Sequence, residues 1–273
     1  MEVDSMERML YKYTTLEALA LILKSKCIRL HPLTMKDDLQ EAESDDNIKY
    51  AKYVFISSWM DQPLESIAMW KLYSNMESGV RIGMREMPFK RYTVNECEFR
   101  QFYSQIKLEK ESIDLIAPVE ECFGDSYFIQ NFLYNQILED VEYTDDKSLL
   151  SPKIFDIKPD GLSLQASKLG KYKNTYWEFQ KEKRYILRIN PFDVKKIKSE
   201  VNAAQFAYDA FNRDAEFLEY YDLKLCDEAY KSMQITLSPQ FTAGNRVLLE
   251  SLLNRYNEGV VVNESQLLGK IRM

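Results

Sequence analysis

The alternation of apolar and polar residues predicts short strands and one amphipathic helix in the first third of the chain. Residues 9–13 form an apolar and aromatic run that is typical of a strand. Thr14 or Thr15 can then cap a helix that extends to about residue 25, because leucine and alanine recur there at helical spacing. Further strands are expected at 27–30, 53–60 and 79–84, with a polar acidic loop at 32–43 and a short helix at 64–73.

The rest of the chain carries longer helical patterns between its strands. Residues 96–140 are rich in aromatic side chains and are interpreted as helical, and residues 200–222 predict an amphipathic helix. Residues 183–189 predict a strand that ends before Pro191. The remaining expectations are a short strand at 141–143, a weak helix or loop at 163–174, and a C-terminal strand, helix and strand at 234–237, 246–256 and 259–262.

These elements favour an α+β fold with a mixed or antiparallel central sheet and with flanking and inserted helices. Glycine and proline are scarce, at 8 each, and no stretch of the sequence is typical of a linker. We therefore predict a single domain over residues 1–273, with helical insertions near 96–140 and 200–225. A chain of this length can bury a sizeable core without a disulfide or a metal.

Composition narrows the classes of chemistry that the chain can perform. A net charge of -7 disfavours sequence-independent binding to nucleic acid. The four cysteines are scattered without a C-x-x-C pair, which suits a reducing cytosol, and His31 is the only histidine, so no metal is expected. The N-terminal residues are not a signal peptide, and no apolar run approaches a membrane-spanning length. The predicted protein is soluble and cytoplasmic, without a membrane partner.

Several common motifs are absent, namely a phosphate-binding P-loop, a dinucleotide-binding glycine motif and a serine nucleophile elbow. A first candidate cluster remains at Lys12 and Tyr13, on a strand that leads into a helix. The N–H groups at such a helix start can hold an anion. The alternative is an ordinary strand edge followed by a helix cap.

A second cluster combines Ser57 and Ser58 on a buried strand with Trp70 and Tyr73 shortly after it. Buried hydroxyl groups need hydrogen-bond partners, so two consecutive serines in an apolar strand are worth noting. The alternative is that these serines only complete the strand.

The third cluster is the segment 176–184, which places three polar side chains at alternate positions. On an extended chain Gln180, Glu182 and Arg184 point to the same face. A guanidinium beside a carboxylate keeps it ionised, and the set can orient a polar ligand. The alternative is a solvated charged strand with a structural Glu–Arg pair.

At these clusters the sequence resembles a bacterial family known as domain of unknown function 2971. The resemblance rests on the motifs at 10–13, 28–30, 56–59, 69–73 and 79–82, on Lys173 four residues before Trp177, and on Gln180-x-Glu182-x-Arg184. It spans nearly the whole chain. The sequence departs from the family at Lys36 and Leu39, where asparagine and proline are usual, and at Gln180, where a second glutamate is common.

The order of elements also resembles the ADP-ribosyltransferase fold, whose enzymes use NAD. The resemblance implies that Glu182 is catalytic and stabilises the charge that develops on the nicotinamide ribose, and that Gln180 positions the acceptor. It further implies that Lys12 contacts a phosphate, that Ser57 and Ser58 supply the serine-bearing strand, and that Tyr13 or Tyr73 stacks on a ring. Trp70 and Arg184 complete the predicted ligand contacts. The partners would be a small-molecule nucleotide and a macromolecular acceptor that the sequence does not identify, in a toxin or an anti-phage effector.

Two other functions remain open from the sequence. One is a magnesium-dependent nuclease that uses the acidic loop, with Asp37, Asp38, Glu41 and Glu182 as ligands. The other is a non-catalytic sensor or interaction module in which Trp59, Trp70 and Trp177 form the floor of a ligand pocket.

Overall fold

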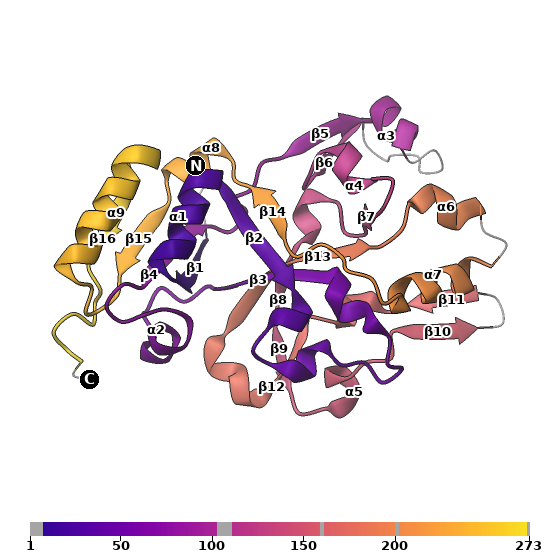
Figure 1. Ribbon diagram of the computed structural model, residues 1–273, viewed down its shortest axis with the longest axis horizontal. Coiled ribbons are helices and arrows are strands. Elements are labelled where there is room, and N and C mark those ends of the chain that lie inside the picture. The colour runs from indigo at the N-terminus through magenta and orange to yellow at the C-terminus, as the bar shows by residue number, and fades with distance from the viewer. Residues whose placement is uncertain (1–7, 103–110, 159–160, 200–201, 272–273) are drawn as a thin grey trace, which may run out of the picture.

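A mixed sheet of short strands crosses the molecule and gives it an α+β fold (Figure 1). The structure is a computed structural model that describes residues 8–102, 111–158, 161–199 and 202–271. Within these residues the main path of the sheet runs in the order β14 (Tyr221–Lys224), β2 (Cys27–Pro32), β3 (Val54–Met60), β1 (Met9–Thr14), β4 (Val80–Arg85), β15 (Gln234–Leu237) and β16 (Val261–Asn263). Neighbours on this path are antiparallel, except for the parallel pair of β15 and β16.

A long buried strand extends the sheet from the second edge of β3. This strand, β13 (Glu182–Asn190), pairs with β3 antiparallel from Glu182, opposite Met60, to Arg188, opposite Val54. It also pairs with β7 (Phe128–Ile129) and β8 (Leu138–Asp140). All nine residues of β13 are buried, so this strand forms the centre of the sheet rather than an edge.

Short helices and small ladders surround this sheet (Figure 1). The helices are α1 (Leu16–Ser25), α2 (Ile67–Tyr73), α3 (Glu96–Phe102), α4 (Val119–Cys122), α5 (Lys147–Leu150), α6 (Val194–Ser199), α7 (Ala203–Asn212), α8 (Asp227–Lys231) and α9 (Ala243–Tyr256). The ladders pair β5 (Tyr92–Asn95) with β6 (Ser112–Leu115), β10 (Phe155–Lys158) with β11 (Gly161–Leu164), and β9 (Glu142–Thr144) with β12 (Tyr172–Asn174). Among the described residues, none of the helices has both the length and the apolar character needed to span a membrane.

The sequence around α1 explains how the first strands are connected. The side chain of Thr15 caps the helix by accepting a hydrogen bond from the backbone N–H of Ala18. Four apolar residues repeat at helical spacing and are buried, namely Leu16, Leu19, Ile22 and Leu23. Lys26 ends the helix in the left-handed region, with φ of 55°, and its N–H bonds to the carbonyl of Ile22. The chain can therefore reverse directly into β2.

One edge of β3 is only partly paired, and its unpaired part lies at the candidate site. This edge pairs with β2 only at Phe55 and Ile56, and with β1 only where Met60 lies opposite Tyr11. Between these contacts, residues 57–59 have no ladder partner on that edge within the described chain. The opposite edge pairs with β13 throughout. The strands β1 and β2 therefore diverge on either side of a gap in the sheet.

Most of the predicted elements are confirmed, with bounds that differ by a few residues. The strands at 9–13, 27–30, 53–60, 79–84, 183–189 and 234–237 correspond to β1, β2, β3, β4, β13 and β15. The predicted helices at 15–25, 64–73 and 246–256 correspond to α1, α2 and α9. The short strand expected at 141–143 is β9, displaced by one residue.

The helical interpretation of residues 96–140 is wrong for most of its described part. After α3, this range contains β6, the single turn of α4, β7, the 3₁₀ turn η4 (Tyr134–Gln136) and β8. Its aromatic residues pack as a cluster between segments, with Phe99, Phe123 and Phe132 in mutual contact. Pro118 precedes α4 and Gly124 follows it, so the chain is interrupted at both ends of that turn. Residues 103–110 lie outside the described residues.

Two further segments differ from the prediction. The amphipathic helix expected at 200–222 is α7, which ends at Asn212, and the chain reaches strand β14 at Tyr221; residues 200 and 201 lie outside the described part. The weak helix or loop expected at 163–174 contains the end of β11, a 3₁₀ turn and the strand β12. Short strands of three or four residues carry too little periodicity to be distinguished from loops in a sequence.

Candidate functional site

A cavity of about 130 Å³ lies beside this gap in the sheet, and residues of β1 and β3 belong to its wall. Five segments that are distant in the sequence contribute to its wall: β1, the loop after β2, β3, α2, and the stretch from β12 to β13. The lining residues are Tyr11, Lys12, Tyr13, Lys36, Asp37, Ser58, Trp59, Met69, Tyr73, Lys173, Gln180, Glu182 and Arg184. All three candidate clusters of the sequence therefore contribute to one cavity.

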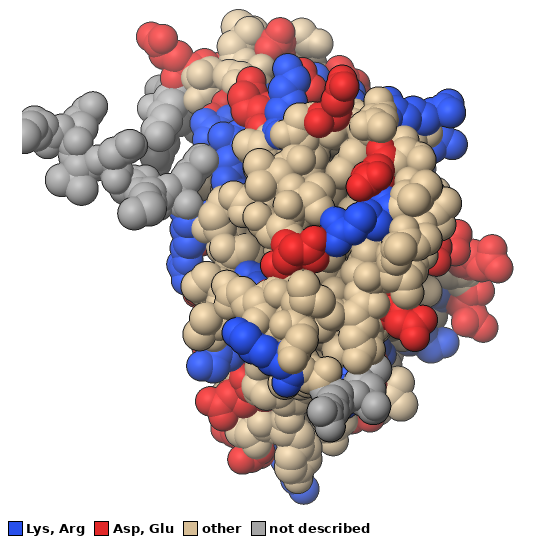
Figure 2. Space-filling model, turned by 90° about the vertical axis from the view of Figure 1, so that its left-hand side faces the viewer, with Lys and Arg blue, Asp and Glu red and all other residues tan. Residues whose placement is uncertain are grey.

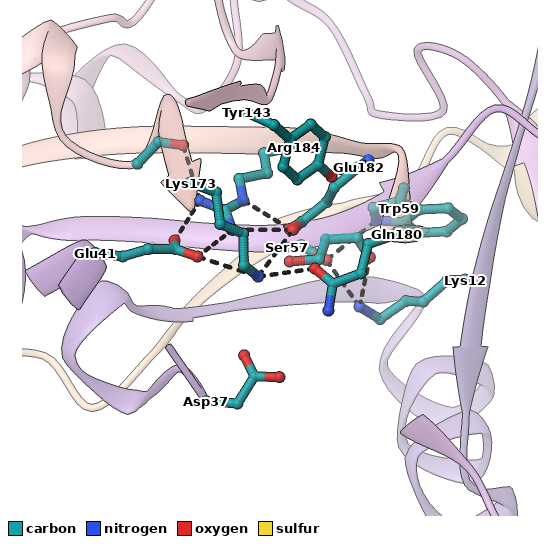
Figure 3. A network of polar contacts seen from close by, with 12 residues as sticks. Lys12, Asp37, Glu41, Ser57, Trp59, Tyr143, Lys173, Gln180, Glu182 and Arg184 are labelled. Atoms are coloured by element: carbon teal, nitrogen blue, oxygen red, sulfur yellow. Dashed lines mark hydrogen bonds and ion pairs between the residues drawn. The ribbon is translucent and has the colours of Figure 1, made fainter. Parts of the chain in front are cut away.

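The deepest part of the wall is a pair of carboxylates bound by one guanidinium (Figure 3). Arg184 donates to Glu182 through Nε at 2.6 Å and Nη2 at 3.0 Å. It donates to Glu41 through Nη1 at 2.5 Å and Nη2 at 3.0 Å, and to the carbonyl of Gly170 at 2.9 Å. These contacts use all five N–H donors of the guanidinium. Arg184 is only 1% exposed, so it holds the two carboxylates and has no donor left for a ligand.

Lys173 completes this network as a second buried cation. Its amino group lies 3.1 Å from Glu41 Oε1 and 3.4 Å from Glu182 Oε2, and it donates to Gln180 Oε1 at 2.8 Å. Two buried carboxylates therefore share two buried cations. The equal number of positive and negative charges stabilises the network, because a buried charge without a partner costs several kcal/mol.

Glu182 is ionised in this environment. Burial alone raises the pKa of its carboxyl group, but the charges of Arg184 and Lys173 and hydrogen bonds from Arg184 and Ser58 outweigh burial and hold the pKa at about 2. The backbone N–H of Glu182 donates to the hydroxyl of Tyr143 at 2.8 Å, which fixes the start of β13. The result is a carboxylate in a cavity wall, with its charge and its orientation both fixed.

Tyr73 links the acidic loop to the segment before β13. Its hydroxyl donates to Asp37 at 2.6 Å and accepts a hydrogen bond from the amide of Gln180. Because the amide oxygen of Gln180 accepts from Lys173, both ends of the amide are engaged. Gln180 lies in the 3₁₀ turn η6 (Thr175–Gln180), and Lys181 then adopts a left-handed conformation with φ of 43°. Gln180 therefore reaches the cavity from a turn, and not from the extended strand that the sequence predicted.

Lys12 lies at the gap itself. Its amino group donates to the carbonyl of Ser58 at 3.1 Å and lies 3.4 Å from the hydroxyl of Ser57, which also accepts from Trp59 Nε1. No carboxylate lies within ion-pair distance of Lys12 among the described residues. Burial and the nearby charge of Lys36 lower the pKa of Lys12 to about 7, and Glu182 opposes that shift.

A second and larger cavity, of about 540 Å³, adjoins the first. The two share Lys12, Tyr13, Lys36 and Tyr73 in their walls. The second cavity extends along α1 and β2, with Lys24, Arg29, His31 and Ser57 in its lining. Arg29 is already paired with Asp222 at 2.8 and 2.9 Å, whereas the side-chain amino group of Lys36 makes no hydrogen bond or ion pair with any described residue.

The structure brings together most of the predicted site residues, with one clear exception. Lys12, Tyr13, Ser58, Tyr73, Gln180, Glu182 and Arg184 line the first cavity, and Ser57 lines the second. Trp70 lines neither cavity, because it is fully buried against Tyr13, with ring centroids 4.8 Å apart, and donates to Glu65. It therefore packs the core and has no surface for a ligand. Tyr13 is 6% exposed, and its hydroxyl accepts from the N–H of Ser66.

Three residues of the site have roles that the sequence did not reveal. Lys173 and Glu41 complete the ion network, and Lys36 supplies a cation without a partner. The spacing of Lys173 from Glu182 does not indicate a contact until η6 folds the chain back. The position of Lys36 in a polar loop gives no sign of a cation that faces a cavity.

The residues proposed for the magnesium-dependent nuclease and for the tryptophan-floored pocket do not form these sites in the structure. Within the described chain, no group of three or more His, Cys, Asp or Glu side chains is arranged to hold a metal, and Glu41 and Glu182 share Arg184 and Lys173 instead. The three tryptophans do not form one floor, since Trp59 lines the first cavity, Trp70 is in the core and Trp177 is half-buried beside Lys173.

Comparison with models of known protein families, with curated proteins and with solved structures found no match to this chain.

Proposed function

We propose that the cavity beside the gap binds a nucleotide of the NAD type and that the protein cleaves its nicotinamide–ribose bond. The observation that carries this proposal is the convergence of Lys12, Tyr73, Gln180 and Glu182 on one cavity from four separate segments. The resemblance of the sequence to ADP-ribosyltransferases points to the same four residues.

The charges of the cavity suit a ligand with phosphate groups. Four basic side chains line it, Lys12, Lys36, Lys173 and Arg184, against the carboxylates of Asp37 and Glu182. Lys173 and Arg184 are neutralised by Glu41 and Glu182, so the positive charge available to a ligand is that of Lys36, and Lys12 beside it offers N–H donors. We assign these two residues to the pyrophosphate of the nucleotide.

Glu182 would act on the ribose. As the glycosidic bond breaks, nicotinamide leaves with the bonding electrons and positive charge develops at the anomeric carbon. A carboxylate that is already ionised and held in place stabilises that charge without reorganising. The amide of Gln180, fixed by Tyr73 and Lys173, would orient the nucleophile, which is water or a group on a macromolecular acceptor.

Release of nicotinamide from NAD tests this function. The wild-type protein is incubated with NAD, with and without a cell extract as the source of acceptor, and free nicotinamide is quantified. Glu182→Gln should lower the rate by about a hundredfold or more, as does the loss of other transition-state contacts of this kind. Glu178→Gln is the matched control, because Glu178 is exposed on η6 and lies outside the cavity.

Two outcomes count against the proposal. One is that the wild-type protein releases no nicotinamide under either condition. The other is that Glu182→Gln remains as active as the Glu178→Gln control. Because Glu182 belongs to the buried ion network, the melting temperature of each variant must be measured beside its activity.

A further inference from the structure

Lys12, which is half-buried, differs from the buried Lys173 in its partners. Lys173 lies within 3.4 Å of two carboxylates, whereas the amino group of Lys12 lies 3.4 Å from a hydroxyl, 3.1 Å from a carbonyl and 5.7 Å from the ring centroid of Trp59, with no carboxylate in ion-pair range among the described residues. Hydroxyl and carbonyl oxygens accept a hydrogen bond from a neutral amine as well as from an ammonium ion. A poorly hydrated ammonium without a carboxylate is costly, so this position favours the neutral amine.

Burial and the charge of Lys36 lower the pKa of Lys12, and Glu182 opposes them. Lys36, from the loop after β2, and His31, on β2, are the basic groups that face it, and Glu182 on β13 is the carboxylate. Tyr73, on α2, and Tyr13, on the same strand as Lys12, are neutral phenols at neutral pH, since burial raises the pKa of both. The lowered pKa of Lys12, about 7, agrees with this arrangement.

The position of Lys12 also makes its amine accessible. Its side chain belongs to the walls of both cavities, the first of about 130 Å³ and the second of about 540 Å³. A small molecule that enters from either side reaches the same amino group. A neutral amine that faces a cavity, as opposed to a tightly packed core, is a nucleophile toward carbonyl compounds.

We propose that Lys12 is a site of imine formation with the aldehyde group of a small phosphorylated molecule. The amine nitrogen adds to the aldehyde carbon, the carbinolamine loses one water molecule, and a carbon–nitrogen double bond remains. The phosphate lies against Lys36, whose side-chain amino group has no hydrogen bond or ion pair with the described residues and lines both cavities. Burial and the charge of Arg184 lower the pKa of Lys36, and an adjacent phosphate opposes that shift. The reaction needs no NAD, but it uses the two lysines that the proposed function assigns to the pyrophosphate, so the two ligands would compete for one place.

Pyridoxal 5′-phosphate is a suitable probe, because it carries one aldehyde and one phosphate. The full chain is incubated with an equimolar amount at about pH 7.5, the imine is reduced with borohydride, and the modified peptides are mapped by mass spectrometry. At this pH an amine with a pKa near 7 is mostly neutral, while an ordinary exposed lysine is less than about 1% neutral. Lys12 should therefore be modified on the order of tenfold more than Lys24, an exposed lysine of the second cavity.

Three comparisons complete the test. Modification of Lys12 should rise between about pH 6 and 8 and change little above that range. Lys12→Arg should abolish the selective product, with its melting temperature showing that it folds. Pyridoxal without the phosphate, or Lys36→Gln with the phosphorylated probe, should lower the modification of Lys12 by several-fold.

The proposal is overturned if the label in the wild-type protein is spread over exposed lysines without preference for Lys12. Mapping of the wild-type protein gives this answer even if Lys12→Arg does not fold. Equal modification by pyridoxal and by its phosphate would reject the phosphorylated class of ligand.

Discussion

Arg184 determines the arrangement of the site at the scale of single residues. One guanidinium orients two carboxylates, and one of them, Glu182, faces the cavity. Arg184 pairs both with Glu182, two residues before it, and with Glu41 of the acidic loop. The role of Arg184 is thus to position the carboxylate, since all of its own donors are occupied.

Arg184→Lys should lower the free energy of unfolding by about 3 kcal/mol. Lysine has one charged group and cannot form parallel hydrogen bonds to two carboxylates, so part of a buried ion network is left without a partner. Urea unfolding at neutral pH measures the change. Arg29→Lys is the matched control, because the pair of Arg29 and Asp222 is also bidentate but partly exposed, and about 1 kcal/mol or less is expected there. Equal midpoints for Arg184→Lys and the wild type would contradict a buried network.

Because Glu182 is ionised in the folded protein, the free energy of unfolding should decrease at acid pH. The pKa of Glu182 is lowered from 4.5 to about 2 on folding, so its contribution is complete above about pH 4.5 and is lost as the pH falls toward 2. A shift of this size corresponds to about 3 kcal/mol in that window. Urea unfolding at several pH values between 2 and 6 measures the slope. Glu182→Gln should show a shallower slope in this range, and identical slopes would show that Glu182 does not carry the effect.

At the scale of elements, the divergence of β1 and β2 from the free edge of β3 creates the site. The edge residues 57–59 face the space between the two strands, and Lys12 reaches across it to the carbonyl of Ser58. Helix α2 closes one side, because Met69 and Tyr73 belong to the cavity wall. The turn that follows α2 fixes the helix against β4.

Gly79 is expected to be essential for that turn. A Cβ atom at this position would lie 2.4 Å from the carbonyl oxygen of Asn75 and 2.5 Å from the hydroxyl of Ser74. Gly79→Ala should therefore cost about 1–3 kcal/mol, as for other overpacked sites, and should displace Tyr73. Thermal unfolding measures the loss. Gly244→Ala is the control, because nothing lies within 4 Å of its Cβ position on α9, and its melting temperature should be unchanged or higher.

The elements and the site were predictable from the sequence to different degrees. Strands such as β3 and β13 were predictable, because β-branched, aromatic and other apolar residues dominate VFISSWM and the YILRI part of β13. The region 96–140 was not, because its aromatic residues pack between short segments and do not form one helical face. Gln180, Glu182 and Arg184 were recognisable by spacing, but the contacts of Lys173 and Glu41 depend on loops that only the folded chain brings together.

At the scale of the whole molecule, the site is a local exception to the charge of the chain. The protein carries a net charge of -7, and on the face in Figure 2 acidic and basic side chains are interspersed. The cavity beside β3 instead has more basic than acidic residues in its wall. If the proposed function is right, a small anionic ligand should bind at the cavity and not to the surface as a whole.

Calorimetric titration with ADP-ribose, which retains both phosphates and is not itself cleaved, tests most directly whether this cavity binds the nucleotide. We expect one site per chain, with affinity that Lys36→Gln weakens about tenfold, or about 1.4 kcal/mol. Lys171→Gln is the control, because Lys171 pairs with Glu142 at the surface and lies outside both cavities, and it should bind as the wild type does. No detectable binding to the wild type, or equal affinity in Lys36→Gln, would contradict the assignment of the cavity to a phosphate-bearing nucleotide.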